Sequence, residues 1–302
     1  MRDVSTKANT LRTAKGRAVL RCHSETIAAI RSGDVPKADP LGVARIAGIQ
    51  AAKNTSILIP YCHQVPLDFV GVDIELRNDT IQIETEVRAV WKTGVEMEAL
   101  CAASVTALAL YDMLKIIDES MAIASVQLIE KRGGKSDVAQ VEISGLKAAV
   151  LVMSDKGAIG KREDLSGKMI REYLTSIGLN IAGYKIIPDD ATEIEREIRA
   201  LSDEGKMDLV LTTGGTGVGP RDITPEATSK LLERELPGIS ERLRSFGQER
   251  TAYSMLSRGI AGTRGKTLII NLPGSPSGVR DALDVLFPWV LHVLPMMRGE
   301  EH

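Results

Sequence analysis

Residues 207–225 read MDLVLTTGGTGVGPRDITP, an apolar segment that leads into four glycines within six positions and then a proline. Glycines between a strand and the N-terminus of a helix leave backbone N–H groups free to face an anion, and the helix dipole assists. Thr224 is a suitable N-cap for that helix, and Pro225 suits its first turn. The stretch predicts a phosphate-binding loop. The alternative is a tight turn whose glycines only supply positive φ.

Strand and helix patterns alternate on both sides of this loop. Strands are expected at 147–153, 179–187, 207–213 and 267–272, and helices at 164–177, 192–202, 225–233 and 277–286. Such repeated units are typical of a mostly parallel sheet, covered on both faces, that binds ligands at the carboxyl ends of its strands. The two common nucleotide motifs are absent. The third glycine of GxGxxG, Gly219, comes one place early, and Ile129 stands where a P-loop ending at Lys135-Ser136 needs glycine.

Two aspartates follow strands near the glycine loop. Asp222 lies next to the glycine loop, three positions after Gly219, and Asp189 follows the strand expected at 179–187. Asp190 forms a weak capping box with Glu193, which leaves Asp189 free to face the crevice. Two carboxylates beside a phosphate site suit Mg²⁺, and the alternative is that they are solvated loop residues. A second strand-to-helix loop, NLPGSPSG at 271–278, offers serines and backbone amides for a second anion.

Several short motifs of this half together resemble the molybdopterin adenylyltransferase family, which includes MogA-type enzymes and the G domains of gephyrin. They are Ser154-Asp155, Ile187–Asp190, Thr213–Gly217, Pro220–Pro225, Leu236–Gly238 and Asn271–Ser275. The similarity spans about residues 147–297. It implies an α/β three-layer domain (molybdopterin-binding, Rossmann-like), usually trimeric. It also implies transfer of AMP from Mg-ATP to the terminal phosphate of molybdopterin, with release of pyrophosphate.

The same resemblance implies roles for individual residues. Asp189 and Asp222 are implied to be the essential carboxylates, and they are the residues that we expect to bind Mg²⁺. Contacts with phosphates and substrates are implied for Ser154, Asp155, Gly214, Gly215, Thr216, Gly217, Ser275 and Ser277. The loop at 274–278 departs from the pattern because it lacks the lysines that some relatives carry there.

The first half of the chain mixes strands with helices in a different order. Strands are expected at 68–76, 80–90 and 121–130, and helices at 24–32, 45–53 and 95–117. This order predicts an α+β sandwich with helices on one face of an antiparallel sheet. Residues 132–145 then change to glycine, serine and charge without a sustained period, which indicates a linker. We expect domains at 1–137 and 147–302, joined by residues 138–146.

Charged residues occupy both ends of the long helix in this half. Glu96 and Glu98 open it, and Asp112 and Lys115 lie near its end. On a continuous helix, Glu98 and Asp112 share a face but lie about 21 Å apart, too far for one small substrate to touch both. The spacing predicts either two sites or one site assembled from two subunits in a two-fold arrangement, and we favour the shared site. The Cys62-His63 pair lacks two further ligands at zinc spacing and is expected to pack instead.

Five motifs of this half resemble the cyclic pyranopterin monophosphate synthase (MoaC) family: residues 44–53, 58–63, 92–100, 110–115 and 131–136. The resemblance covers most of residues 2–137. It implies a ferredoxin-like α+β fold, commonly hexameric, with active sites at subunit interfaces. The implied substrate is 3′,8-cyclo-7,8-dihydro-GTP, which is rearranged to cyclic pyranopterin monophosphate with loss of pyrophosphate.

Residue roles in the first half come from this second resemblance. Asp112 and Lys115 are implied to be the acid/base pair, three positions apart on one helix face, with Lys131 as a further proton-transfer residue. Four residues are implied to come from the neighbouring subunit: Lys37, His63, Glu96 and Glu98. Contacts with phosphates or substrate are implied for Arg12, Cys62, Met97 and Lys135. Ala38 and Gln64 stand where the family usually has glycine and proline, and neither change removes a charged participant.

Composition limits the other classes of function. The 302 residues are 43% hydrophobic and 26% charged, with a formal net charge of −2, which is a globular balance without a basic arm for nucleic acid. Aromatic residues, at 3%, leave few platforms for stacking on single strands. The three cysteines predict neither a disulfide framework nor a structural zinc site, and no redox cofactor is expected. No apolar run reaches the ~20 residues of a membrane span and the first residues lack a signal-peptide core, so we expect a cytoplasmic protein.

Both resemblances point to molybdenum cofactor synthesis. We expect a bifunctional enzyme with an α+β ferredoxin-like N-terminal domain followed by an α/β three-layer C-terminal domain, in a homo-oligomer, most simply a hexamer. The expected ligands are cyclic dihydro-GTP, molybdopterin and Mg-ATP, and the expected protein partner is a molybdenum insertion enzyme. Two alternatives stay open for the second half: a non-catalytic molybdopterin-binding scaffold, or a nicotinamide-dependent oxidoreductase. The displaced glycine argues against the oxidoreductase, although Glu235 lies near where a ribose-binding acid would fall.

Overall fold

The computed structural model describes residues 1–37, 39–134 and 143–300. It divides into two compact units, Met1–Asp137 and Val138–His302, and each unit is considered by itself. Most of the expected linker at 138–146 lies outside the described residues, as do Ala38, Lys135 and Ser136.

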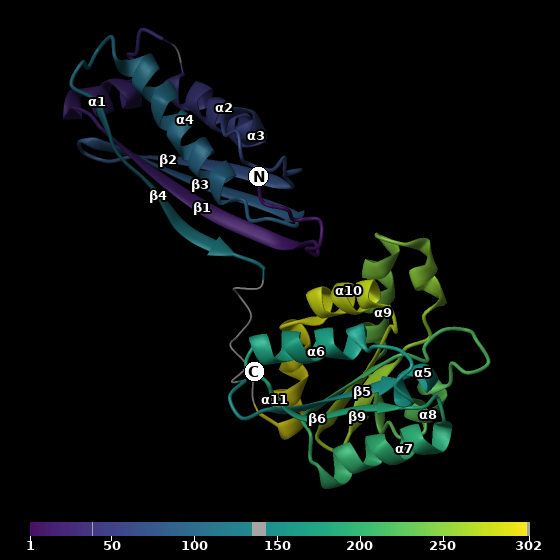
Figure 1. The fold of residues 1–302 in the computed structure, drawn as a ribbon. Helices are drawn as coiled ribbons and strands as arrows, with labels where there is room; N and C mark the ends of the chain where they lie inside the picture. The colour runs from purple at the N-terminus through teal and green to yellow at the C-terminus, as the bar shows by residue number, and fades with distance from the viewer. Residues whose placement is uncertain (38, 135–142, 301–302) are drawn as a thin grey trace. The chain divides into compact units, whose positions relative to one another are not determined.

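The N-terminal unit is built on a four-stranded antiparallel sheet (Figure 1). Its strands are β1 (Thr10–Arg21), β2 (Phe69–Leu76), β3 (Thr80–Trp91) and β4 (Ala122–Arg132), in the order β2-β3-β1-β4. β1 pairs with both β3 and β4, although no strand is expected there from the sequence. Its buried positions include Ala14, Gly16 and Ala18, and residues this small give little contrast in hydropathy with their polar neighbours.

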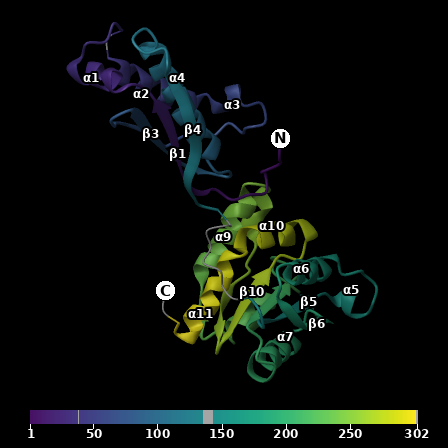
Figure 2. The same cartoon turned by 90° about the vertical axis from the view of Figure 1, so that its left-hand side faces the viewer.

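Helices cover one face of this sheet (Figures 1 and 2). They are α1 (Ser24–Ser32), α2 (Pro40–Lys53), α3 (Thr55–Leu58) and α4 (Glu96–Leu114). The α+β class expected from the sequence is therefore confirmed. α2 begins earlier than the predicted Arg45, because Pro40 occupies its first turn and the Asp39 carboxylate accepts a hydrogen bond from Gly42 N at 2.8 Å. α4 is slightly shorter than the predicted 95–117.

α4 is long and apolar enough to pass as a membrane span, but it is the core helix of this unit. Its buried face consists largely of alanines, among them Ala99, Ala102 and Ala103, and these pack with residues of β1, β3 and α2. Small residues on this face let α4 approach both the sheet and α2 closely.

Gly48 of α2 lies tightly against α4. A Cβ atom at this position would overlap Thr106 Oγ1 and lie 3.1 Å from Ala102 O. We expect Gly48→Ala to destabilise the N-terminal unit by about 1–3 kcal/mol, as overpacking does in a filled core. Thr106→Ala should recover part of that loss, because it removes the overlapping hydroxyl. Peptide-resolved hydrogen exchange of α2 and α4 in denaturant measures both effects. Equal stability of Gly48→Ala and the wild type would contradict the close packing.

The C-terminal unit is built on a six-stranded sheet in the order β6-β5-β7-β10-β9-β8. β5 (Lys147–Met153), β6 (Asn180–Ile187), β7 (Leu209–Thr213) and β10 (Thr267–Leu272) are parallel. β9 (Ala261–Arg264) pairs antiparallel with both β10 and β8 (Arg234–Glu235), and neither of these edge strands is expected from the sequence. The sheet is therefore mixed, while its parallel part follows the predicted strands.

Helices lie on both faces of this sheet, as the α/β pattern predicted (Figure 1). α6 (Leu165–Ser176), α9 (Pro237–Gln248) and α10 (Pro276–Leu286) gather on one face, and α7 (Ala191–Arg199) and α8 (Thr224–Ser229) on the other. The remaining elements are short: α5 (Asp155–Ala158), a π-helical turn at Ala200–Glu204, 3₁₀ turns at Ala252–Leu256 and Trp289–His292, and α11 (Val293–Arg298). α9 was not predicted, and α8 ends before the predicted 233.

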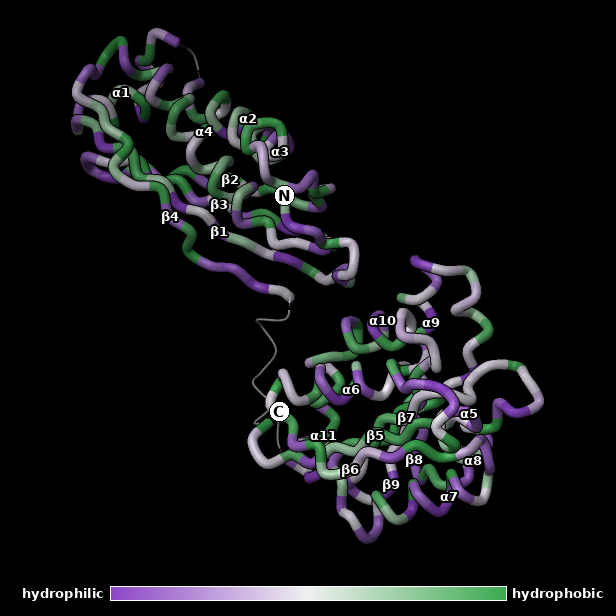
Figure 3. The backbone as a smooth tube through the Cα atoms, in the orientation of Figure 1, coloured by the Kyte–Doolittle hydropathy of each residue, from purple (hydrophilic) through white to green (hydrophobic). Residues whose placement is uncertain are grey.

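The core of the C-terminal unit explains why its central strands were easy to predict. β7 and β10 are buried at every residue, and β5 at every residue after Lys147. Figure 3 shows β5 and β7 as mainly hydrophobic segments at the centre of the unit. Parallel strands covered on both faces read as continuous apolar runs.

Candidate active sites

The carboxyl ends of the four parallel strands meet at one edge of the C-terminal sheet. Ser154 and Asp155 follow β5, Asp189 follows β6, the glycine loop follows β7, and the 273–275 turn follows β10. Residues from four separate stretches of sequence are thereby collected at the edge where such sheets bind ligands.

The backbone of the glycine loop is held by Thr224. Its hydroxyl donates to Gly214 O at 3.0 Å and its N–H donates to Gly215 O at 3.1 Å. The prediction that Thr224 caps α8 is therefore wrong, since the helix begins at Thr224 and its N-cap is Ile223. Gly214 and Gly215 both have positive φ, and a side chain at either position would collide with Met153 O or Thr224 Oγ1. The glycines thus keep the loop against the strand ends, with its backbone available to a ligand.

Asp155 and Asp189 form a reciprocal pair. Asp189 N donates to Asp155 Oδ1 and Asp155 N donates to Asp189 Oδ2, each at 3.1 Å. Arg221 donates to Asp155 Oδ1 at 2.7 Å and lowers the pKa of that carboxyl, whereas burial raises the pKa of Asp189. Asp190 accepts a hydrogen bond from Glu193 N at 2.9 Å, which confirms the predicted cap of α7.

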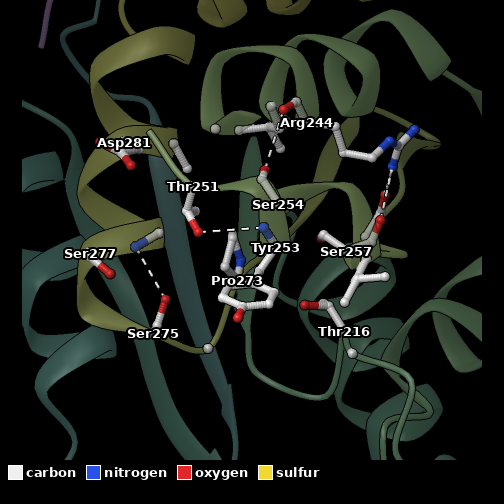
Figure 4. Close-up of a pocket in the computed structure, with 18 of the residues that line it drawn as sticks. Thr216, Arg244, Thr251, Tyr253, Ser254, Ser257, Pro273, Ser275, Ser277 and Asp281 are labelled. Carbon is white, nitrogen blue, oxygen red and sulfur yellow. Dashed lines mark hydrogen bonds between the residues drawn. The ribbon is translucent and has the colours of Figure 1, made fainter. Parts of the chain in front are cut away.

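Two adjoining cavities lie at this edge. The first, of about 370 Å³, is lined by Ser154, Arg162, Asp189, Arg221, Asp222 and the first glycines of the loop. The second, of about 330 Å³, lies between the start of α10 and the segment 251–257 (Figure 4). Gly274 and Ser275 line both cavities. Ser275 Oγ also caps α10 by accepting a hydrogen bond from Gly278 N at 3.2 Å, so this serine has a structural role as well.

The first cavity suits a divalent cation carried by a phosphate substrate. Asp189 and Asp222 both line it, and Asp222 Oδ2 accepts a hydrogen bond from Gly219 N at 2.8 Å. Within the described ranges, no group of three or more His, Cys, Asp or Glu side chains is placed to hold a metal. Two carboxylates with substrate phosphates and water complete the usual coordination of Mg²⁺, so the residues present fit that ion.

Two parts of the cavity walls were not predicted from the sequence. They are the segment 251–257 and the arginines of the first cavity. Tyr253 and Leu256 line the second cavity, and Arg162 and Arg221 line the first. The only signal for Arg221 was its place in the Pro220–Pro225 motif beside Asp222. No pattern in the sequence marks segment 251–257, because its position depends on the fold.

In the N-terminal unit, Asp112 lies near the C-terminal end of α4 between two lysines. Its carboxylate binds Lys115 Nζ at 2.8 Å and Lys37 Nζ at 2.9 Å, and Lys37 also donates to Asp112 O at 3.0 Å. These contacts with Lys115 and Lys37 lower the pKa of Asp112 to about 2 and raise the pKa of Lys115. We call these three residues the Asp112 cluster. It has a fixed carboxylate and two cations at the surface.

A second group lies at the other end of α4, and we call it the Glu98 cluster: Arg12, Cys62, Glu96, Glu98 and Lys131. Lys131 Nζ lies 3.5 Å from Glu96 Oε1, and Arg12 donates to Trp91 O at 3.2 Å. Glu98 is only 3% exposed, and burial raises its pKa to about 7. Burial also raises the pKa of the Cys62 thiol. His63 binds Arg2 O at 2.8 Å, and Met97 is partly exposed.

The two clusters divide the residues differently from the division that the resemblance implied. Within one chain, Lys37 belongs with Asp112, and Lys131 belongs with Glu96. α4 is continuous from Glu96 to Leu114, so the clusters lie about 21 Å apart along its axis. Asp112 and Glu98 therefore cannot contact one small substrate within a single chain.

The raised pKa of Glu98 predicts a pH-dependent effect of Glu98→Gln on stability. The unfolded carboxyl ionises near its ordinary pKa, but the folded one stays protonated up to about pH 7. Its cost to folding is therefore absent below pH 4.5, accumulates as pH rises to 7, and is constant above. Glu98→Gln should raise the free energy of unfolding by up to about 3 kcal/mol at pH 8 and change it little at pH 4.5. Denaturant unfolding at both pH values checks this, and an equal effect at both would refute the assignment.

Comparison with known proteins finds relatives for each of the two units. The MoaC family model matches residues 1–134, and a model described as a probable molybdopterin binding domain matches residues 149–292. A cyclic pyranopterin monophosphate synthase of Novosphingobium aromaticivorans is 52% identical over 136 residues, covering 45% of this chain and 87% of that protein. A molybdopterin adenylyltransferase of Helicobacter pylori is 43% identical over 152 residues, covering 50% of this chain and 86% of that protein.

Some relatives match the whole chain. A molybdenum cofactor biosynthesis bifunctional protein of Chlorobaculum tepidum is 44% identical over 304 residues, covering 100% of this chain and 96% of that protein. Both resemblances inferred from the sequence motifs are thereby confirmed. The chain belongs to the family of molybdenum cofactor biosynthesis bifunctional proteins, in which a MoaC domain is fused to a MogA-like molybdopterin-binding domain.

Proposed function

We propose that the N-terminal unit converts 3′,8-cyclo-7,8-dihydro-GTP to cyclic pyranopterin monophosphate and pyrophosphate. Opening and rearranging a purine ring requires proton transfers, and the triphosphate of the substrate requires cations. The Asp112 cluster supplies an acid/base pair held in contact at 2.8 Å. Glu98, whose pKa lies near 7, and Lys131 offer further groups for proton transfer.

The active site of this unit is proposed to be shared by two subunits. The observation that supports it is the distance of about 21 Å between the Asp112 and Glu98 clusters on one helix. A two-fold axis that places two α4 helices antiparallel would bring the Asp112 cluster of one subunit to the Glu98 cluster of the other. We propose a homo-oligomer built from such pairs, and a hexamer accommodates both these pairs and trimers of the C-terminal unit.

The C-terminal unit is proposed to adenylylate molybdopterin. An oxygen of the terminal phosphate of molybdopterin attacks the α-phosphorus of ATP, and the bond from that phosphorus to the β-phosphate oxygen breaks. Pyrophosphate leaves with the electron pair, so atoms and charge balance. The observation that carries the proposal is that Asp189 and Asp222 line one cavity with the glycine loop, and that a second cavity adjoins it across Gly274 and Ser275.

The two cavities suggest how the two substrates are placed. The first is proposed to take the nucleotide phosphates, because the glycine-loop amides, Arg162 and Arg221 lie there. The second, with its partly apolar wall at Tyr253 and Leu256, is proposed to take the pterin. Asp189 and Asp222 would hold Mg²⁺, which when bound neutralises charge on the phosphates. Gly274 and Ser275 line both cavities, so the two substrates would meet at this turn.

The alternative is that the C-terminal unit binds molybdopterin as a scaffold without turnover. Binding alone does not require two carboxylates beside a phosphate loop, which favours catalysis. The test is to incubate the purified protein with molybdopterin and Mg-ATP and to search for the adenylylated pterin by mass spectrometry. Its formation supports the adenylyltransferase, whereas bound but unmodified molybdopterin supports the scaffold.

The two proposed steps are not consecutive, because sulfur must enter the pterin between them. Direct transfer of a product from one unit to the other is therefore not part of the proposal. We also propose that the protein is cytoplasmic and that a molybdenum insertion enzyme accepts the adenylylated product.

A further inference from the structure

Arg258 contacts both ends of the loop 217–222, the part of the glycine loop that ends in Asp222. Its backbone N donates to Thr216 O at 2.9 Å, and its Nε donates to Gly217 O at 2.6 Å. One terminal nitrogen donates to Asp222 O, and the other binds the carboxylate of Glu226 in the first turn of α8. A single side chain therefore joins the start of the loop, its end and the following helix.

The loop itself does not fix where Asp222 lies. Its internal bonds, Gly219 N to Asp222 Oδ2 at 2.8 Å and Asp222 N to Gly219 O at 3.0 Å, define the shape of a turn. Val218 at its tip is 72% exposed, and the loop contains two glycines, which lose more conformational freedom on ordering than other residues. The position of this turn relative to α8 and to the opposite carboxylate, Asp189, depends on contacts made from outside it.

We propose that Arg258 is a positioning residue for adenylyl transfer, which holds the Asp222 carboxylate where it and Asp189 together bind the divalent cation of the nucleotide substrate. The inference rests on the function proposed for the C-terminal unit. A guanidinium is suited to this role because its planar fork donates in several fixed directions at once. A lysine ammonium at the same place cannot reach Gly217 O, Asp222 O and Glu226 together. Arg258 does not line either cavity, so its effect on the substrates acts through the loop.

The test measures cation binding without turnover. Mn²⁺ is titrated into the full-length protein with an ATP analogue that has a methylene group between the α- and β-phosphorus atoms, and free Mn²⁺ is read by electron paramagnetic resonance. We expect Arg258→Gln to weaken Mn²⁺ binding about 10-fold, as loss of an outer-shell partner of a metal ligand does, and Arg258→Lys to fall between it and the wild type. In the adenylylation assay, the apparent Mg²⁺ constant should rise to the same extent and saturating Mg²⁺ should restore the rate.

Arg264→Gln is the matched control. Arg264 also joins a carbonyl and a carboxylate, Leu231 O at 3.2 Å and Asp203 at 2.7 Å, but it lines neither cavity and does not touch the loop. It should leave Mn²⁺ affinity unchanged even where it lowers the melting temperature. The inference is overturned if Arg258→Gln lowers the melting temperature without changing Mn²⁺ affinity. It is also overturned if Arg264→Gln weakens Mn²⁺ binding as much as Arg258→Gln does. Wild-type protein that binds Mn²⁺ with the analogue but forms no adenylylated pterin refutes the proposed function and leaves the test of Arg258 intact.

Discussion

Asp222→Asn should lower the rate of molybdopterin adenylylation on the order of 100- to 1,000-fold, the loss seen when one preorganised electrostatic partner of a transition state is removed. The amide is the size of the carboxylate, and its oxygen can still accept the hydrogen bond from Gly219 N. The fold of the loop is therefore retained, while one of the two negative charges that line the first cavity, the one beside Asp189's, is lost. Mass spectrometry of the adenylylated pterin over time gives the rate.

Asp190→Asn is the control for this substitution. Asp190 adjoins Asp189 but caps α7, and asparagine is as good an N-cap as aspartate. This control should adenylylate at the wild-type rate. A wild-type rate in Asp222→Asn itself would remove Asp222 from the mechanism and would favour the scaffold.

Asp112→Ala should lower formation of cyclic pyranopterin monophosphate at least about 100-fold, because general acid/base groups contribute by factors of this size or more. The change leaves Lys37 and Lys115 without their shared carboxylate. Asp112 is exposed in the chain, so the unit should fold normally. Conversion of cyclic dihydro-GTP is followed by release of pyrophosphate. Glu75→Ala, which breaks an exposed ion pair with Arg77, is the control and should keep full activity.

The same variant tests whether the site is shared. Asp112→Ala mixed with an inactive Glu96→Ala chain should recover about a quarter of wild-type activity. Half of randomly formed two-fold pairs combine the two variants, and one of their two sites is then intact. Exchange of subunits is promoted by mild denaturant before the assay. If no mixture exceeds the activity of either variant, the Asp112 and Glu98 clusters do not form one site between subunits.

Much of the architecture could be predicted because its signals are local. Buried parallel strands gave continuous apolar runs, and Asp190 gave a cap whose hydrogen bond to Glu193 N is present. The 14-residue separation of Glu98 and Asp112 needed only the pitch of a helix, and α4 is continuous over both residues.

The missed elements have signals that depend on tertiary contacts. β1 faces α4 with Ala14, Gly16 and Ala18, small residues selected by the closeness of the helix rather than by hydropathy. β8 and β9 are short edge strands, whose pairing cannot be read from a few residues. Element ends shifted for the same reason, as at Thr224, whose hydroxyl bonds to Gly214 O instead of capping its helix.

Site residues that belong to a sequence motif could be predicted. Residues that lie far away in the sequence and reach the site only through the fold could not. Asp189 and Asp222 were found by their places after strands, and both line the same cavity. Arg258 lies 36 residues beyond Asp222, and only the fold brings its guanidinium to the glycine loop. The pairing of Lys37 with Asp112 likewise joins a loop before α2 to the end of α4.

If the two sites of this chain work independently, each can be inactivated without loss of the other. This is checked by measuring both products, cyclic pyranopterin monophosphate and adenylylated molybdopterin, from the same preparations of Asp112→Ala and Asp222→Asn. We expect Asp112→Ala to form only adenylylated molybdopterin and Asp222→Asn to form only cyclic pyranopterin monophosphate. Loss of both products in either folded variant would contradict it.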